Sequence, residues 1–132
     1  GIRQLMGQND LIVEAAGGLL APLGSDDSTV LDLLKDLPLP VILVTRPHLG
    51  TINHTWMTTR LLQQAEVNIL GFIVNHHQAV TSSLATTGIA DYLTRLSNVD
   101  CLLEIPWDNQ PTSTYYRTWS EKLAPVVLQA MP

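Results

Sequence analysis

The sequence is poor in basic residues and has no long hydrophobic run. Its 132 residues include seven Lys and Arg against twelve Asp and Glu, which gives a net charge of −5 at pH 7. The basic residues are scattered singly, so no basic patch is available to bind nucleic acid or an anionic membrane. No apolar run is long enough to cross a bilayer, and no secretory signal is visible. We therefore expect neither nucleic acid nor a membrane among the partners.

Cysteine is almost absent. The single cysteine, Cys101, excludes an internal disulfide framework and fits a reducing compartment, so we expect a cytoplasmic protein. Cys101 lies in an apolar segment, which predicts a buried structural thiol rather than a reactive one.

Lysine is also scarce, and this excludes a phosphate-binding P-loop. The pattern G-x-x-x-x-G-K-[ST] is required for such a loop, but neither Lys35 nor Lys122, the only two lysines, follows a glycine. The chain by itself is therefore not expected to carry out phosphoryl transfer in the usual P-loop manner. The sequence also starts at Gly1 rather than Met, with residues 2–6 resembling the end of a helix. We expect an incomplete chain.

The most informative segment that is present is PVILVTRPHLGTINH, residues 40–54. Residues 41–44 are apolar and β-branched, which predicts a strand buried on both faces, as in a parallel sheet. Gly50 then turns the chain, and Thr51 is able to cap the helix that follows. Apolar residues recur at helical spacing after the turn, namely Ile52, Trp56, Met57, Leu61, Leu62 and Ala65. Open α/β sheets bind ligands at this edge, and the free N–H groups of a helix start favour an anion. The alternative is an ordinary strand–helix joint.

The remaining pattern predicts an α/β fold. Apolar runs predict further strands at residues 11–14, 67–74 and 101–105, and helices are predicted between them. Ser28 or Thr29 caps a helix that ends at Leu37. Ser82 or Ser83 caps another helix, with Leu84, Ile89, Tyr92, Leu93 and Leu96 on one face. Residues 116–130 form a last helix that Pro125 kinks or restarts. This alternation predicts βαβ units, a parallel sheet with helices on both faces, and no domain boundary.

Two residues stand where predicted strands end. Glu14 is followed by small residues, and a carboxylate there can hold Mg²⁺ directly or through water; the alternative is a solvated loop acid. Gly17, with its neighbour Gly18, can admit a phosphate or simply form a tight turn. Asn75 offers both donors and an acceptor to the edge of a base such as adenine; the alternative is a turn initiator.

A metal site at His76 and His77 is not expected. Adjacent histidines tend to point apart, and no Cys or third His lies at ligand spacing.

Four segments, in order, resemble dethiobiotin synthetase. Residues 13–23, VEAAGGLLAPL, are similar to the family's VEGAGG…PL segment, and residues 39–44 and 49–55 to its LPVILV…LGTINHT segment. Residues 71–75, GFIVN, resemble its GxxxN strand, and residues 104–107, EIPW, its EIPW segment. The resemblance covers essentially all of this chain but only the C-terminal half or somewhat more of the family's length. It implies that residues 1–132 are the C-terminal part of a single P-loop NTPase-like domain whose Walker A strand–loop–helix is absent here.

The resemblance also implies an activity and a set of site residues. These enzymes are ATP-dependent cyclo-ligases of biotin synthesis. They act as homodimers and close the ureido ring of dethiobiotin from 7,8-diaminononanoate and CO₂, with ATP and Mg²⁺. By resemblance, Glu14 is the Mg²⁺ ligand, Gly17 lies against ATP and Asn75 reads adenine. The base is lined by Pro106, Trp107 and Asp108. The substrate carboxylate is bound, at the neighbouring subunit's site, by Gly50, Thr51, Ile52 and Asn53.

The chain departs from the family pattern in three ways. Ala15 replaces the first glycine of EGAGG, no acidic residue follows Trp107 within residues 109–113, and the family's catalytic lysine and P-loop are not found. This chain is therefore a fragment of a longer enzyme, a subunit that needs a partner, or a relative that has lost the activity. A non-catalytic nucleotide-binding or interaction module derived from the same fold is the alternative function. The LGTINH segment argues against a related amide-forming ligase such as a cobyrinic acid amidase.

Overall fold

The computed structural model describes residues 2–6, 10–15, 17–37, 39–79 and 88–130. The chain divides into two compact units, Gly1–Leu39 and Pro40–Pro132. Within the described residues, no helix combines the length and the apolar character that crossing a membrane requires.

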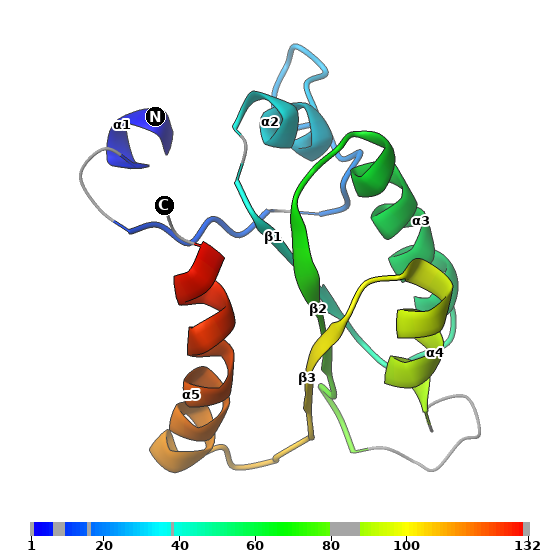
Figure 1. Ribbon diagram of the computed structural model, residues 1–132, viewed down its shortest axis with the longest axis vertical. Coiled ribbons are helices and arrows are strands. Elements are labelled where there is room, and N and C mark those ends of the chain that lie inside the picture. Colours follow the sequence, from blue (N-terminus) through cyan, green and yellow to red (C-terminus); the bar gives the residue numbers. More distant parts are fainter. Residues whose placement is uncertain (1, 7–9, 16, 38, 80–87, 131–132) are drawn as a thin grey trace. The chain divides into compact units, whose positions relative to one another are not determined.

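The second unit contains a parallel sheet of three strands in the order β1-β2-β3 (Figure 1). The strands are β1 (Val41–Thr45), β2 (Ile69–Asn75) and β3 (Cys101–Ile105). Their β-branched and apolar residues suit the pleated, packed surface of a sheet. Three of the four predicted strands are thus confirmed, with boundaries within two residues of those expected.

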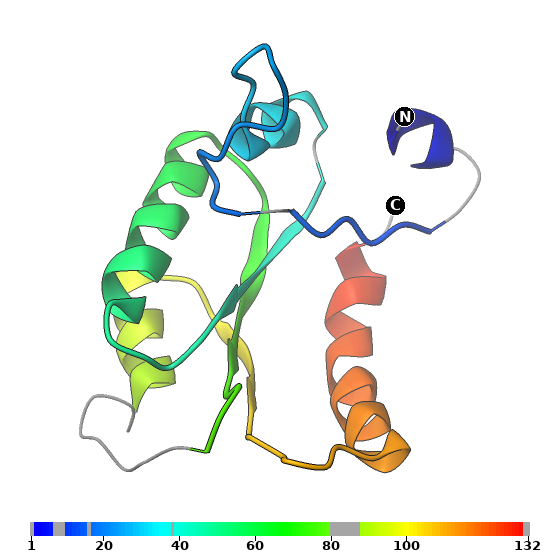
Figure 2. The same ribbon diagram turned by 180° about the vertical axis from the view of Figure 1, so that it is seen from behind.

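Helices cover both faces of this sheet (Figures 1 and 2). On one face α3 (Thr51–Gln64) and α4 (Ile89–Ser97) pack against each other, α3 also contacting β1 and α4 contacting β3. On the other face α5 (Ser113–Ala130) contacts β3. The predicted fold class, a parallel α/β sheet with helices on both faces, is confirmed.

The core of the unit lies between β2 and α4. Phe72 and Val74 of β2 pack with Ile89 and Leu93 of α4 and with Val99, and all five are buried. Cys101 is half-buried against this cluster. Burial, and then the negative charge of Glu104, raise the pKa of the Cys101 thiol. The thiol therefore stays protonated at neutral pH, as expected of a structural rather than a reactive cysteine.

Two expectations about strands were wrong. The β1 strand is not buried on both faces, because Val44 is 65% exposed. β1 lies at one edge of the sheet, and the helix that packs on the other face, α5, contacts β3 at the opposite edge. Residues 11–14 form no strand, and Ile12 is 96% exposed. A strand exists only where a neighbour pairs with its backbone, and the structure describes no such partner for this segment.

The face of α3 that meets the sheet also differs from the prediction. Ile52, Trp56 and Met57 are 38%, 41% and 50% exposed, although they were expected to form the apolar face. Leu62 is buried as predicted, but the other buried positions are Thr51, Thr55 and Thr59. Threonine methyl groups can fill such a face when their hydroxyls find hydrogen-bond partners.

The last two helices differ from the predictions in their boundaries. The predicted caps Ser82 and Ser83, with Leu84, lie outside the described residues, and α4 begins at Ile89 after Gly88, which has a left-handed backbone with φ of 73°. Pro125 lies inside α5 and does not restart it.

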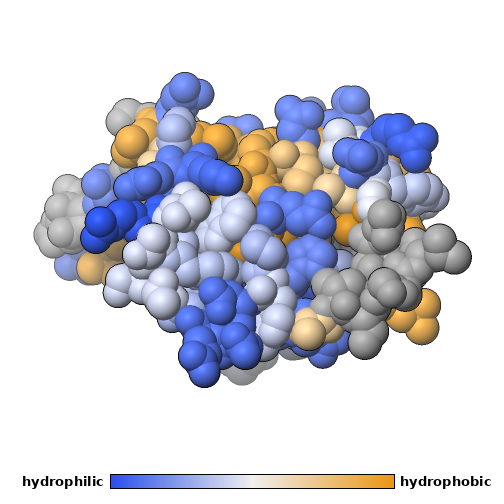
Figure 3. Space-filling view, turned by 90° about the horizontal axis from the view of Figure 1, so that it is seen from below, coloured by the Kyte–Doolittle hydropathy of each residue, from blue (hydrophilic) through white to orange (hydrophobic). Residues whose placement is uncertain are grey.

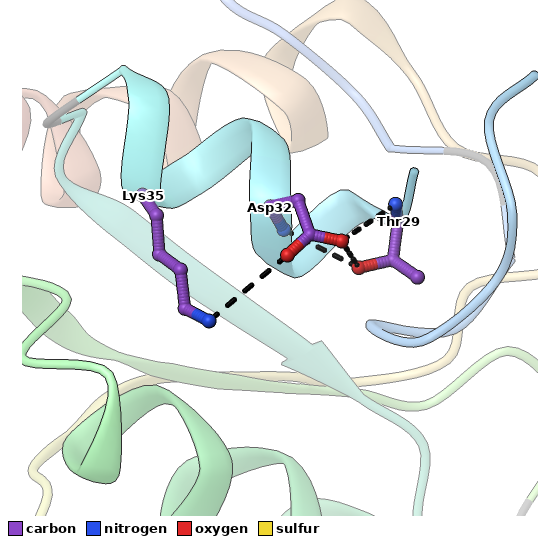
Figure 4. A network of polar contacts seen from close by, with 3 residues as sticks. All are labelled: Thr29, Asp32 and Lys35. Atoms are coloured by element: carbon purple, nitrogen blue, oxygen red, sulfur yellow. Dashed lines mark hydrogen bonds and ion pairs between the residues drawn. The ribbon is translucent and has the colours of Figure 1, made fainter. Parts of the chain in front are cut away.

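The first unit contains α1 (Ile2–Met6) and α2 (Val30–Asp36). Thr29, one of the two predicted caps, begins α2 with a capping box (Figure 4). The Thr29 backbone N–H donates to Asp32 Oδ2 at 3.0 Å, and the Asp32 N–H donates to Thr29 Oγ1 at 3.3 Å. Hydrogen bonds from Thr29 lower the pKa of Asp32, and Lys35 Nζ lies 4.0 Å from Asp32 Oδ1. A cap of this kind contributes about 1 kcal/mol to helix stability.

Candidate functional site

The carboxyl ends of the three strands meet at one edge of the sheet. Thr45 of β1 pairs with Val74 of β2, and the next residue, Asn75, pairs with Ile105 of β3. The segments that follow the strands therefore begin side by side, as the parallel order requires. Viewed from below, at this end of the strands, the molecule shows hydrophilic residues over much of its surface with a hydrophobic band beside them (Figure 3). Three of the predicted groups are thereby brought to one edge: Gly50 to Asn53, Asn75, and Pro106 to Asp108.

Gly50 makes the turn between β1 and α3. Its backbone is left-handed, with φ of 91° and ψ of −10°, a conformation that favours glycine. Gly50 is also the N-cap of α3, and no side chain caps the helix there. The Thr51 N–H donates to the His48 carbonyl at 3.1 Å. The side chains of Ile52 and Asn53 are exposed in the first turn of the helix.

The capping role expected of Thr51 was wrong. The Thr51 side chain is buried, and its hydroxyl lies 2.6 Å from Thr45 Oγ1 at the end of β1. Thr45 Oγ1 also lies 2.7 Å from Thr55 Oγ1, one turn further along α3. The first turn of α3 is thus attached to the last residue of β1.

Asn75 and the segment after β3 lie next to each other in the sheet register. Asn75 is partly exposed, and Trp107 is 45% exposed. The Tyr115 hydroxyl, on α5, donates to the Pro106 carbonyl at 2.8 Å. Asp108 Oδ1 accepts a hydrogen bond from the Gln110 N–H at 2.9 Å, which fixes a local turn. The start of α5 therefore shapes the segment that is predicted to line a base.

The two adjacent histidines have different neighbours. His76 Nε2 lies 2.8 Å from Glu104 Oε1, and the His76 N–H donates to the Ile105 carbonyl at 2.9 Å. The His77 ring instead meets His48 edge-on, with 6.4 Å between ring centroids. Within the part of the chain that the structure describes, no group of three or more His, Cys, Asp or Glu could hold a metal ion.

Glu14 and Gly17 belong to the first unit. The Glu14 side chain is exposed. Gly17 has a left-handed backbone with φ of +81°, and a Cβ there would lie 3.1 Å from Ala21 Cβ, so the position favours glycine. The Ala21 N–H donates to the Gly18 carbonyl at 2.8 Å, which closes a tight turn. One exposed carboxylate fits Mg²⁺, because this ion is usually held by one or two carboxylates together with phosphates and water.

Comparison with known families identifies the chain. A family model described as AAA domain matches residues 3–114. The chain belongs to this AAA domain family. The match spans β1, β2 and β3 and every predicted site residue, and it agrees with the parallel α/β fold.

Curated relatives of this AAA domain chain are ATP-dependent dethiobiotin synthetases BioD, so the resemblance to that family is confirmed. The protein of Thermodesulfovibrio yellowstonii is 40% identical over 103 residues, which are 74% of this chain and 43% of the relative. That of Bacillus licheniformis is 48% identical over 64 residues, 48% of this chain and 27% of the relative. That of Neorickettsia sennetsu is 43% identical over 67 residues, 51% and 27% respectively. The matching part covers less than half the length of each of these relatives.

Sequence reasoning found the edge of the sheet but missed the threonine residues that shape it. Thr45 lay just after the predicted strand of residues 41–44 and, like Thr55 and Thr59, was given no role. One signal was available. Threonine recurs every four residues at Thr51, Thr55 and Thr59, which places three hydroxyls on one face of a helix.

Proposed function

We propose that residues 1–132 are the C-terminal part of a single dethiobiotin synthetase domain. The proposed enzyme is cytoplasmic and closes the ureido ring of dethiobiotin from 7,8-diaminononanoate and CO₂, with ATP and Mg²⁺. One observation carries the proposal: the LGTINHT segment forms a left-handed glycine turn and a helix start at the carboxyl edge of a parallel sheet. The family membership and the names of the curated relatives support it. A non-catalytic nucleotide-binding or interaction module of the same fold is the alternative.

In this proposal the first turn of α3 binds the substrate carboxylate. Gly50 and Ile52 offer backbone N–H groups, and the exposed Asn53 side chain offers an amide. The Thr51 N–H already donates to the His48 carbonyl, so Thr51 contributes by holding the turn through its buried side chain. The helix dipole alone contributes only about 0.3–1 kcal/mol at an exposed site. Hydrogen bonds to a charged group add roughly 1.5–3 kcal/mol each. Two or three of these bonds would make the carboxylate a specificity element.

The other predicted residues would bind the nucleotide. Asn75 would read the adenine edge, with Pro106, Trp107 and Asp108 along the base, because these groups are neighbours in the sheet register. Glu14 would hold Mg²⁺, which neutralises phosphate charge when bound, and Gly17 would lie against ATP. No phosphate-binding loop with a lysine is present in these 132 residues. They are therefore not expected to turn over substrate by themselves.

A homodimer is part of the proposal, with each substrate turn serving the partner's site. Large apolar side chains are exposed beside this turn: Leu49 is 95% exposed, and Ile52, Trp56 and Met57 are 38–50% exposed. A cluster of exposed apolar residues next to a functional segment is typical of a protein–protein contact.

The carboxylate role predicts a selective effect of Asn53→Ala. In the protein expressed from its complete open reading frame, the wild type should form dethiobiotin. Asn53→Ala should raise the KM for 7,8-diaminononanoate about tenfold or more while ATP binding stays nearly intact, since one charge-assisted bond is lost. The methyl ester, which lacks the charge, should be affected less than the acid. Steady-state kinetics with both substrates measures this, and equal losses for acid and ester would contradict the role.

The shared site is tested by mixing two defective proteins. An Asn53→Ala subunit and a Glu14→Gln subunit should together recover part of the activity, because some sites would then be assembled from two intact parts. Stably mixed dimers without any recovery would argue against a shared site. Absence of dethiobiotin formation by the wild type would argue for the non-catalytic module.

Adenine recognition predicts an effect of Asn75→Ala on the choice of nucleotide. The loss of hydrogen bonds to a buried base costs roughly 1–3 kcal/mol, so the KM for ATP should rise about fivefold to a hundredfold. The preference for ATP over GTP should narrow by a similar factor. Kinetics with both nucleotides gives the two numbers. If the KM and the ranking are unchanged, Asn75 is a turn residue only.

A further inference from the structure

We propose that Thr45 is a positioning residue, which holds the first turn of α3 in the geometry that the substrate carboxylate requires. The identity of the ligand, a substrate carboxylate, rests on the proposed function. The attachment of the helix start to the sheet is visible in the structure itself. Among the predicted substrate-binding residues, Thr45 contacts the side chain of Thr51.

The geometry centres on one buried hydroxyl. Thr45 Oγ1 lies 2.6 Å from Thr51 Oγ1 and 2.7 Å from Thr55 Oγ1, and the three residues are 9%, 4% and 6% exposed. A threonine hydroxyl has one proton to donate and can accept further bonds, so Thr45 can satisfy both neighbours at once. Among the described residues, no buried side-chain N or O atom lacks a hydrogen-bond partner.

This contact fixes a helix start that has no ordinary cap. Gly50 has no side chain to accept a hydrogen bond from the first turn, and its backbone is left-handed. The hydroxyl contact between Thr51 and Thr45 therefore attaches that turn to the end of β1, where a side-chain cap would otherwise hold it. Asn53 is exposed in the same turn, two residues after the buried Thr51. Asn53 therefore belongs to the turn that the contact between Thr45 and Thr51 holds.

A second buried threonine on the same helix offers a matched control. Thr59 is 1% exposed, and its hydroxyl donates to the Thr55 carbonyl at 2.7 Å, within α3. Removing this hydroxyl takes away a buried hydrogen bond but leaves the contacts of Thr45 in place. Thr59→Val therefore reports the effect of destabilisation alone.

The experiment compares Thr45→Val, Thr45→Ser and Thr59→Val in the protein expressed from its complete open reading frame. Thr45→Val keeps the shape and removes the hydroxyl, whereas Thr45→Ser keeps the hydroxyl. We expect Thr45→Val to raise the KM for 7,8-diaminononanoate about tenfold, with the KM for ATP changed less than about twofold. Thr45→Ser should restore the wild-type KM. Thr59→Val, which also removes a buried hydroxyl of α3, should leave the KM for the diamine unchanged.

Hydrogen exchange provides a readout that does not depend on activity. Thr45→Val should speed amide exchange at Ile52, Asn53 and His54 relative to β2, and Thr45→Ser should not. Equal exchange and equal KM in the valine and serine variants would overturn the proposal, as would a change in Thr59→Val as large as that in Thr45→Val. If the wild type forms no dethiobiotin, the proposed function fails, while the exchange pattern still decides whether Thr45 holds the turn.

Discussion

Replacing Gly71 with alanine is expected to destabilise the second unit by roughly 2–4 kcal/mol. Gly71 lies in β2 with φ of +155°, and a Cβ at this position would lie 2.5 Å from Leu102 Cγ and 2.8 Å from the Asp100 carbonyl oxygen. Both distances are shorter than real Cβ contacts. The Asp100 carbonyl cannot move freely, because it accepts a hydrogen bond from the Phe72 N–H at 2.9 Å. A new methyl group must therefore displace β3 from β2.

The displacement would reach the core, since Phe72 is 1% exposed and packs with Leu93. Equilibrium unfolding in urea, followed by tryptophan fluorescence, measures the loss. Gly88→Ala is the matched control: Gly88 also has a positive φ, of +73°, but among the residues that the structure describes a Cβ there would meet no atom within 4 Å. Gly88→Ala should cost only about 1–2 kcal/mol, the usual penalty for a left-handed alanine. Equal losses in the two variants would show that the contact with β3 is not responsible.

The sheet could be predicted because its signals are local. Val41 to Val44 and Ile69 to Val74 are β-branched or apolar runs, and such runs form strands wherever neighbours are available. What the sequence could not show is which neighbours are present. Val44 is exposed because β1 is an edge strand, and on that face α5 packs against β3 at the opposite edge. Residues 11–13 are likewise apolar, yet they have no described partner strand and form none.

The orientation of α3 could not be predicted from hydropathy alone. Trp56 and Met57 are more apolar than Thr55 and Thr59, so the usual pattern places them inside. The structure buries the threonines because each hydroxyl has a partner: Thr45 for Thr55, and the Thr55 carbonyl for Thr59. A paired hydroxyl removes most of the cost of burial. Such pairing depends on residues that are distant in sequence, which composition and spacing do not reveal.

The position of the candidate site could be predicted for a topological reason. Once the strands are parallel, their carboxyl ends must share one edge. The backbone topology therefore places Gly50, Asn75 and Pro106 at that edge, independently of their side-chain contacts. The detailed roles depend on side-chain contacts that the sequence does not specify. Thr51 was expected to cap α3, but its hydroxyl contacts Thr45 instead.

Replacing Glu14 with glutamine should have the largest effect on activity. The change keeps the shape of the side chain and removes its charge. Mg²⁺ is a hard cation that prefers carboxylate oxygen, so loss of a ligand charge should lower kcat/KM for Mg²⁺–ATP well over tenfold, or more than about 1.4 kcal/mol. The Glu14 side chain is exposed, so the substitution should leave the stability of the fold within about 0.5 kcal/mol of the wild type.

A titration with Mg²⁺ separates a metal ligand from a solvated acid. In the protein expressed from its complete open reading frame, Glu14→Gln should require a higher Mg²⁺ concentration for half-maximal rate, and excess Mg²⁺ should recover part of the loss. Glu121→Gln is the control, because Glu121 is an equally exposed carboxylate on α5 outside the predicted site. Its kinetics should stay within about twofold of the wild type. If Glu14→Gln gives the same Mg²⁺ dependence as Glu121→Gln, Glu14 is a loop acid, and the Mg²⁺ ligand must be sought among other residues.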